Sequence, residues 1–215
     1  MLRSRSNTLV IVRRVTGVNA GRKTAGVDGE VVLTSQAKVD LACWVQHRAK
    51  PWTARPVRRV YIPKKGTSGK RRPLGIPVIA DRVLQACAAS ALEPEWEARF
   101  EPRSYGFRPG RGCHDAIEAV YQPGKGASPA RRWVLDADLA AAFDRIDQLG
   151  TFPARELVAG WLKAGVVDNG RFTPTAEGTP QGGVISPALL NDDGQRYLPD
   201  DRQAWPAVRG GGLPA

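Results

Sequence analysis

The feature that most constrains the fold is a pair of short alternating segments joined by a turn rich in lysine and glycine. The first reads VRRVYIP from Val57, the second reads RPLGIP up to Pro77, and KKGTSGKR lies between them. Alternation of side chains with a period of two is typical of β-strands, and glycine and serine favour the turn. The sequence therefore predicts a β-hairpin with a Lys/Arg tip.

Apolar residues at helical spacing predict four helices elsewhere. They are expected over about 35–48, from Asp81 to about Pro94, over about 114–121, and from Pro153 to a stop at Gly165. Asp81 is expected to cap the second helix, and Pro94 to end or kink it. The first fifty residues otherwise predict an irregular basic arm.

A further strand is predicted in RRWVLDADL, residues 131–139, where Asp136 and Asp138 share one face. Two carboxylates on a strand face suit a metal site, although a solvated or salt-bridged surface is the commoner use, and both interpretations stay open here. After Asn191 the chain becomes rich in glycine, proline and charged residues, and its apolar residues follow neither the helical nor the strand spacing. This composition predicts an irregular tail.

The charge of the chain is concentrated near its start. The whole sequence has 32 Lys and Arg against 21 Asp and Glu, a formal charge of +11, whereas residues 1–72 alone hold 17 basic and 3 acidic residues. A cationic segment of this kind is the expected footprint of RNA or DNA binding. A solubilising basic surface and an anionic membrane surface are the alternatives.

Several function classes are disfavoured by the sequence. No apolar run reaches the length of a membrane span or a signal peptide, so a cytoplasmic protein without membrane contact is expected. The three cysteines have no CxxC spacing, which favours reduced thiols over a disulfide framework or a structural zinc site. The two histidines are isolated and predict no catalytic role.

Taken in order, these segments resemble the reverse transcriptases encoded by group II introns. The resemblance rests on PVRRVYIPKK, KRRPLGIP, SYGFRPGRG, VLDADLAAAFDRID and EGTPQGGVISPALLN, and runs from about Val12 to Asn191. It implies an α+β right-hand polymerase, with fingers and an incomplete palm built from mixed helices and a small antiparallel sheet. Members of that family copy RNA into DNA and assist the splicing of their intron RNA.

The resemblance also implies a role for each matching residue in the palm. Asp138 corresponds to the first metal-binding aspartate, which would hold catalytic Mg²⁺, and Leu139 would offer its backbone carbonyl to a metal. Phe143 corresponds to the aromatic residue that lies under the nucleotide sugar and excludes a 2′-hydroxyl. Packing in the core is the simpler role for Phe143, and both roles are compatible.

Other matching residues would bind nucleotide and template. Lys64 and Arg72 correspond to the cationic pair that holds the triphosphate of an incoming deoxynucleotide, and Gln181 to a residue that contacts its sugar or base. The loop at 104–112 resembles a contact to the template RNA, which pairs with a DNA primer. Its candidate residues are Tyr105, Phe107, Arg108 and Arg111. For the two aromatic residues, burial beneath the loop is the alternative.

The chain departs from the family pattern after Asn191. The aromatic-Ala-Asp-Asp hairpin expected there is absent from the sequence, and the Asp pairs at 192–193 and 200–201 lack the flanking alternation that builds a hairpin. A short internal deletion is also expected after Asp147, and the family's thumb and maturase domain are expected to be missing. A change of reading frame near Asn191 would explain the divergence, and the encoding DNA read in three frames tests it.

These observations predict three regions. They are a basic N-terminal extension over 1–56, the reverse transcriptase fingers and partial palm over 57–191, and an irregular tail over 192–215. One acidic position cannot hold two metal ions, so the chain alone is expected to bind RNA with little or no polymerisation. A non-catalytic RNA-binding module and a remnant without a selected role are the alternatives.

Overall fold

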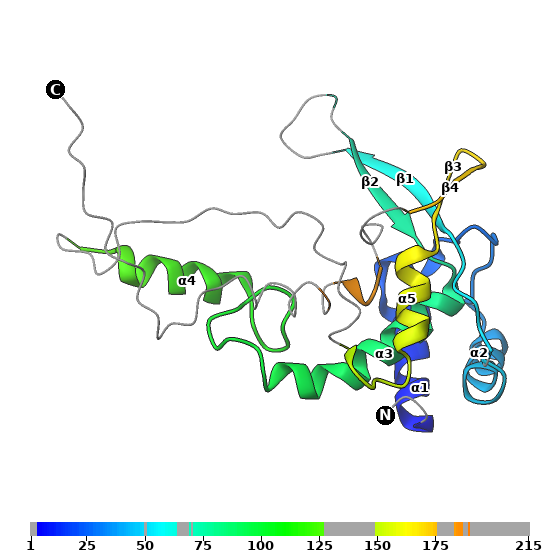
Figure 1. Cartoon of the computed structure of the whole chain (residues 1–215), viewed down its shortest axis with the longest axis horizontal. Helices are drawn as coiled ribbons and strands as arrows, with labels where there is room; N and C mark the ends of the chain where they lie inside the picture. The colour runs from blue at the N-terminus through cyan, green and yellow to red at the C-terminus, as the bar shows by residue number, and fades with distance from the viewer. Residues whose placement is uncertain are drawn as a thin grey trace.

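A computed structural model describes residues 4–49, 51–63, 69, 71–126, 149–175, 183–186 and 189. Five α-helices and a small sheet are present in this part of the chain, which confirms the predicted α+β class (Figure 1). The predicted strand over 131–139 and the predicted tail over 192–215 lie outside it. Among the described residues, no helix combines the length and apolar character that a membrane span requires.

The predicted hairpin is confirmed as β1 (Val57–Pro63) and β2 (Arg71–Ile76), which pair antiparallel. Two shorter strands, β3 (Val166–Asp168) and β4 (Arg171–Thr173), extend the sheet in the order β2-β1-β3-β4. Because β1 and β3 run parallel, the sheet is mixed rather than wholly antiparallel as expected.

The first fifty residues are not an irregular arm, and that prediction was wrong. They form α1 (Arg5–Arg13), a π-helical turn (Arg14–Val18) and a 3₁₀ turn (Ala20–Lys23). Ser4 caps α1 by accepting a hydrogen bond from the amide of Asn7. The buried side chains of this segment recur every three or four residues, which is the spacing of one helix face: Thr8, Ile11, Val12, Val15.

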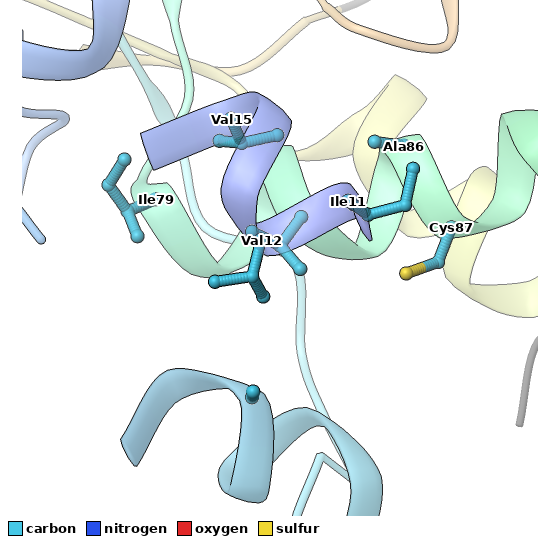
Figure 2. Close-up of a cluster of buried hydrophobic side chains, with 8 residues drawn as sticks. Ile11, Val12, Val15, Ile79, Ala86 and Cys87 are labelled. Carbon is cyan, nitrogen blue, oxygen red and sulfur yellow. The ribbon is translucent and has the colours of Figure 1, made fainter. Parts of the chain in front are cut away.

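The apolar face of α1 meets two other helices in the first of two core clusters. Figure 2 shows Ile11 near Ala86 and Cys87 of α3 (Ile79–Glu97), and Val12 belongs to the same cluster. The predicted helix near residue 35 is confirmed as α2 (Ser35–His47), which adds Ala42 to the same cluster. This core therefore joins residues on either side of the predicted boundary at residue 56.

The third helix, α3, differs at both ends from the expectation. Val78 occupies its N-cap position, so Asp81 lies within the first turn and is not the cap. The helix also continues past Pro94 to Glu97, because the turn after the proline places Trp96 in the second core cluster with Leu92. Burial of these side chains outweighs the hydrogen bond that a proline removes.

The helix expected after Pro153 is confirmed as α5 (Arg155–Lys163), which packs Val158 and Trp161 into the second cluster. Gly165 then ends it in a left-handed conformation with φ +77°. The helix expected near 114–121 is confirmed as α4 (Cys113–Gly124), which buries none of its residues among the described part of the chain.

Candidate nucleic-acid interface

The β1–β2 hairpin carries arginines on both of its faces. The register pairs Ile62 with Arg72 and Pro63 with Arg71. Because side chains alternate along a strand, Arg72 shares a face with Arg58, and Arg71 shares the other face with Arg59. Arg71 and Arg72 are exposed, and neither strand contains an acidic residue. The hairpin therefore carries positive charge on both of its faces.

Tyr61 ties this hairpin to the neighbouring strand. Its hydroxyl donates a hydrogen bond of 2.6 Å to Oδ2 of Asp168 on β3. The same hydrogen bond raises the pKa of Tyr61, because ionising the phenol would place two negative charges together. The contact adds a side-chain link to the short parallel pairing of β1 with β3.

The segment that leads into β1 is fixed by a buried carboxylate on α3. Oδ1 of Asp81 accepts hydrogen bonds from the indole N–H groups of Trp52, at 2.7 Å, and Trp161, at 2.8 Å. Its other oxygen accepts the backbone N–H of Arg55 at 3.0 Å. Burial raises the pKa of Asp81, and the three donors oppose that rise. Asp81 thereby sets where the hairpin leaves the helical core.

Arg82, the next residue on α3, holds the N-terminal segment in place. Its guanidinium is buried and donates to the backbone carbonyls of Pro77, Gly21 and Thr24 at 2.8, 3.0 and 2.5 Å. Burial lowers the pKa of this arginine. The charge of Arg82 is thus used inside the protein and is not part of the cationic surface.

The loop between α3 and α4 is organised around Arg108. Arg108 is buried, with 6% of the residue exposed. Its Nε and Nη2 donate hydrogen bonds to the carboxylate of Glu97, and the shortest of these is 2.6 Å. Its Nη1 donates to the carbonyls of Glu101 and Ser104 at 2.5 and 3.0 Å. Hydrogen bonding to Arg108 lowers the pKa of Glu97. The structure thus gives Arg108 a role in holding the loop, and its contact with RNA stays a prediction.

The other three candidates of this loop lie around Arg108. Arg111 donates to the carbonyls of Pro102 and Ser104, and its guanidinium lies 5.5 Å from the ring centre of Tyr105, which is half-buried. Phe107 is 76% exposed and has a φ of +56°. Burial beneath the loop, the alternative considered for both aromatic residues, is therefore wrong for Phe107.

The loop is separate from the hairpin. Helix α3 joins the two along the chain, as Figure 1 shows, and its 19 residues span about 28 Å. Of the predicted nucleotide-binding and catalytic residues, Arg72 alone falls in the described part, where it is exposed on β2. The others lie outside the described residues and keep their predicted roles: Lys64, Asp138, Leu139, Phe143, Gln181.

Sequence reasoning missed Gln85, a buried side chain of α3 that fixes the turn after Gln181. Oε1 of Gln85 accepts the backbone N–H of Val184 at 2.8 Å. A side chain at Gly183 would lie 2.7 Å from the hydroxyl of Ser186, so glycine suits this close approach. The available signal was the run DRVLQ, which places three polar residues in the otherwise apolar first half of the helix.

No cluster of three or more His, Cys, Asp or Glu side chains gathers for a metal ion within the described ranges. Asp138, the predicted metal ligand, lies outside these ranges. The chemistry that the described residues offer is phosphate binding by exposed arginines and stacking on an exposed aromatic ring.

Comparison with known proteins agrees with this chemistry. Residues 62–192 match the reverse transcriptase (RNA-dependent DNA polymerase) family, and residues 1–44 match the N-terminal domain of reverse transcriptase. The first match covers more than half of the 215 residues, so the chain belongs to the reverse transcriptase family. Enzymes of this family are nucleotidyltransferases that normally use a divalent metal ion.

The relatives confirm the resemblance to the proteins of group II introns. Protein YkfC of Escherichia coli (strain K12) is 39% identical over 192 residues, which are 83% of this chain and 50% of the relative. The group II intron-encoded protein LtrA of Lactococcus lactis subsp. cremoris is 40% identical over 146 residues, 63% of this chain and 24% of the relative. Nuclear intron maturase 1 of Arabidopsis thaliana is 35% identical over 71 residues, which are 33% of this chain and 9% of the relative. The chain thus spans half the length of the first relative and about a quarter of the second.

Proposed function

We propose that these 215 residues bind RNA as a fingers and partial-palm module of a group II intron reverse transcriptase. The observation that carries the proposal is the β1–β2 hairpin, with exposed arginines on both faces and no acidic residue on either strand. A guanidinium can hold a phosphate through two parallel hydrogen bonds, so a two-sided arginine hairpin suits a polyanion that passes along it.

The rest of the N-terminal third supports the same partner. Residues 1–72 contain 17 Lys and Arg but only 3 Asp and Glu, so their acidic side chains cannot neutralise the basic ones. The excess charge favours association with a nucleic acid and makes that association depend on salt. The α3–α4 loop adds Phe107, an exposed ring on which an unpaired base can stack.

The family's reaction assigns further roles, which we include in the proposal. Lys64 and Arg72 hold the triphosphate of a deoxynucleotide that extends a DNA primer, and Gln181 contacts its sugar or base. Asp138 holds Mg²⁺, with Leu139 offering its carbonyl, and Phe143 lies under the sugar. A bound Mg²⁺ pair would supply activation of the primer hydroxyl and stabilisation of the leaving oxygen.

For these 215 residues alone we propose RNA binding with little primer extension. The sequence contains Asp138 but no aromatic-Ala-Asp-Asp hairpin after Asn191. A single carboxylate leaves two metal ions without enough fixed ligands, because such sites need ligands held on rigid elements.

The experiment measures the affinity of the purified chain for a single-stranded RNA at several salt concentrations. We expect the logarithm of the binding constant to fall linearly with that of the salt concentration, with a slope of about −0.7 for each phosphate neutralised. Replacing both Arg71 and Arg72 with Ala should flatten the slope. The double variant Arg155→Ala/Lys163→Ala is the matched control, since it also removes two exposed cations but takes them from α5. A slope near zero for the unmodified chain would refute the proposal.

A further inference from the structure

The α3–α4 loop holds one aromatic side chain, that of Phe107, on the surface of the protein. Phe107 is 76% exposed, so its ring gains little from burial. Its φ of +56° places a bulky side chain in the left-handed region, where such residues are rarely found. A strained conformation of this kind persists only where surrounding contacts impose it, and such positions gather at ligand-binding sites.

The residue that follows Phe107 is held by several contacts. Arg108 is directed inward, and its guanidinium joins the end of α3, through Glu97, to two carbonyls of the loop. The arginine also lies 5.4 Å from the ring centre of Phe100. With Arg108 fixed inside the loop, the preceding side chain is left on the outside.

Glu97 is the anchor of this arrangement. It is the last residue of α3, and its carboxylate receives both Nε and Nη2 of Arg108, a forked geometry that fixes the orientation of the guanidinium. The side chain of Arg108 is 3% exposed and that of Glu97 is 33% exposed, so the pair is shielded on the arginine side. Removing the carboxylate would leave a buried guanidinium without its charged partner.

We propose that Glu97 is a positioning residue that, through Arg108, holds Phe107 outward as a stacking platform for an unpaired RNA base. This inference rests on the proposed RNA binding and adds to it a rigid aromatic contact with its own support. Stacking on a π-face is tolerant of base identity, so the platform recognises single-stranded RNA of any sequence. The phosphate contacts of the hairpin remain separate from it.

The test compares variants of the full chain for binding of a fluorescein-labelled single-stranded oligoadenylate, followed by anisotropy. We expect Phe107→Ala to weaken binding about tenfold, which is typical of one lost stacking contact, without changing the salt slope. Phe107→Trp should retain the affinity and show quenching of the new indole when RNA binds. Phe172→Ala, which removes an exposed phenylalanine of β4, should bind as the unmodified chain does.

Glu97 is tested by coupling to Phe107. Glu97→Gln should weaken binding several-fold in the unmodified chain and produce no further loss in a Phe107→Ala background. Glu95→Gln, a matched charge change on the same helix at an exposed residue, should have little effect. Equal losses from Glu97→Gln in both backgrounds would overturn the positioning role, because a general structural defect does not depend on the ring.

The two proposals fail in different ways. An unmodified chain that does not bind the oligoadenylate at low salt would overturn RNA binding itself. An unmodified chain that binds with a steep salt slope, while Phe107→Ala binds equally well, would overturn only the stacking platform. Loss of binding in Phe107→Ala, with Phe107→Trp active and quenched, would support the proposal.

Discussion

The indole N–H of Trp161 on α5 donates a hydrogen bond of 2.8 Å to Asp81 on α3, eighty residues earlier in the chain. Asp81 is fully buried and receives two further donors, from Trp52 and the amide of Arg55. One carboxylate therefore connects α3, α5 and the segment that enters the hairpin. The position of the cationic hairpin on the core depends on this contact.

Asp81→Ala should destabilise the fold by about 3 kcal/mol, because it leaves buried donors without an acceptor. Trp161→Phe removes one donor and leaves a smaller ring in the second core cluster, so it should cost about 1–3 kcal/mol. Chemical denaturation measures both values. Asp40→Ala, on the exposed face of α2, is the control and should change stability little. Equal stability of the Asp81→Ala and control variants would contradict the role given to Asp81.

Gly165 and Gly170 form a matched pair for testing the end of α5. Both have positive φ, +77° and +80°, but a side chain at Gly165 would overlap the ring of Phe172, whereas Gly170 faces open space. Gly170→Ala should cost about 1 kcal/mol from backbone strain alone. Gly165→Ala should cost about 1–3 kcal/mol more, because the ring must move. Thermal melting of both variants checks the difference, and equal losses would contradict the predicted contact.

The Tyr61–Asp168 contact predicts a pH dependence at the alkaline end. The pKa of Tyr61 is raised above its ordinary value near 10, so the folded state favours the neutral phenol. The stabilisation is therefore complete below pH 10 and is lost as the pH rises through the raised pKa. Denaturant midpoints of the chain and of Tyr61→Phe should converge above that pH. Tyr121→Phe serves as control, and a constant difference up to high pH would be inconsistent with the contact.

Gln85→Met should release the turn at 183–186 by removing the acceptor of the Val184 amide. A buried donor left without a partner costs about 1–3 kcal/mol, so the Val184 amide should exchange with solvent faster. Hydrogen exchange followed by mass spectrometry measures this directly. Gln36→Met, at an exposed site on α2, is the control and should leave the exchange of the Val184 amide unchanged. Unaltered exchange at Val184 in Gln85→Met would show that Gln85 does not hold the turn.

Much of the fold follows from local signals in the sequence. The hairpin, α2, α4 and α5 were predictable because alternation or helical spacing persists over several residues. The β3–β4 hairpin was missed although Asn169 and Gly170, both with positive φ, form the dipeptide most typical of a tight hairpin turn. Helix α1 was missed because its apolar face is short and lies among arginines. Its stability comes from packing on α2 and α3, which sequence spacing alone does not reveal.

The candidate site was predictable only in part. The motif SYGFRPGRG placed Tyr105, Phe107 and Arg111 in one ordered loop, as the structure has them. The inward position of Arg108 depends on Glu97, eleven residues away, and no local pattern indicates that pairing. Asp81 and Gln85 were similarly hidden, since Trp161 lies 80 residues after Asp81 and Val184 lies 99 residues after Gln85. Long-range hydrogen bonds leave no periodic signature.

The most direct test of the account is primer extension on an RNA template with Mg²⁺ and deoxynucleotides, with template binding measured on the same samples. The 215-residue chain and its Asp138→Ala variant are compared side by side. We expect that both bind the template and that neither extends the primer. Extension by the unmodified chain that disappears in Asp138→Ala would contradict it, because the metal site would then be complete in a chain that we propose to bind RNA without copying it.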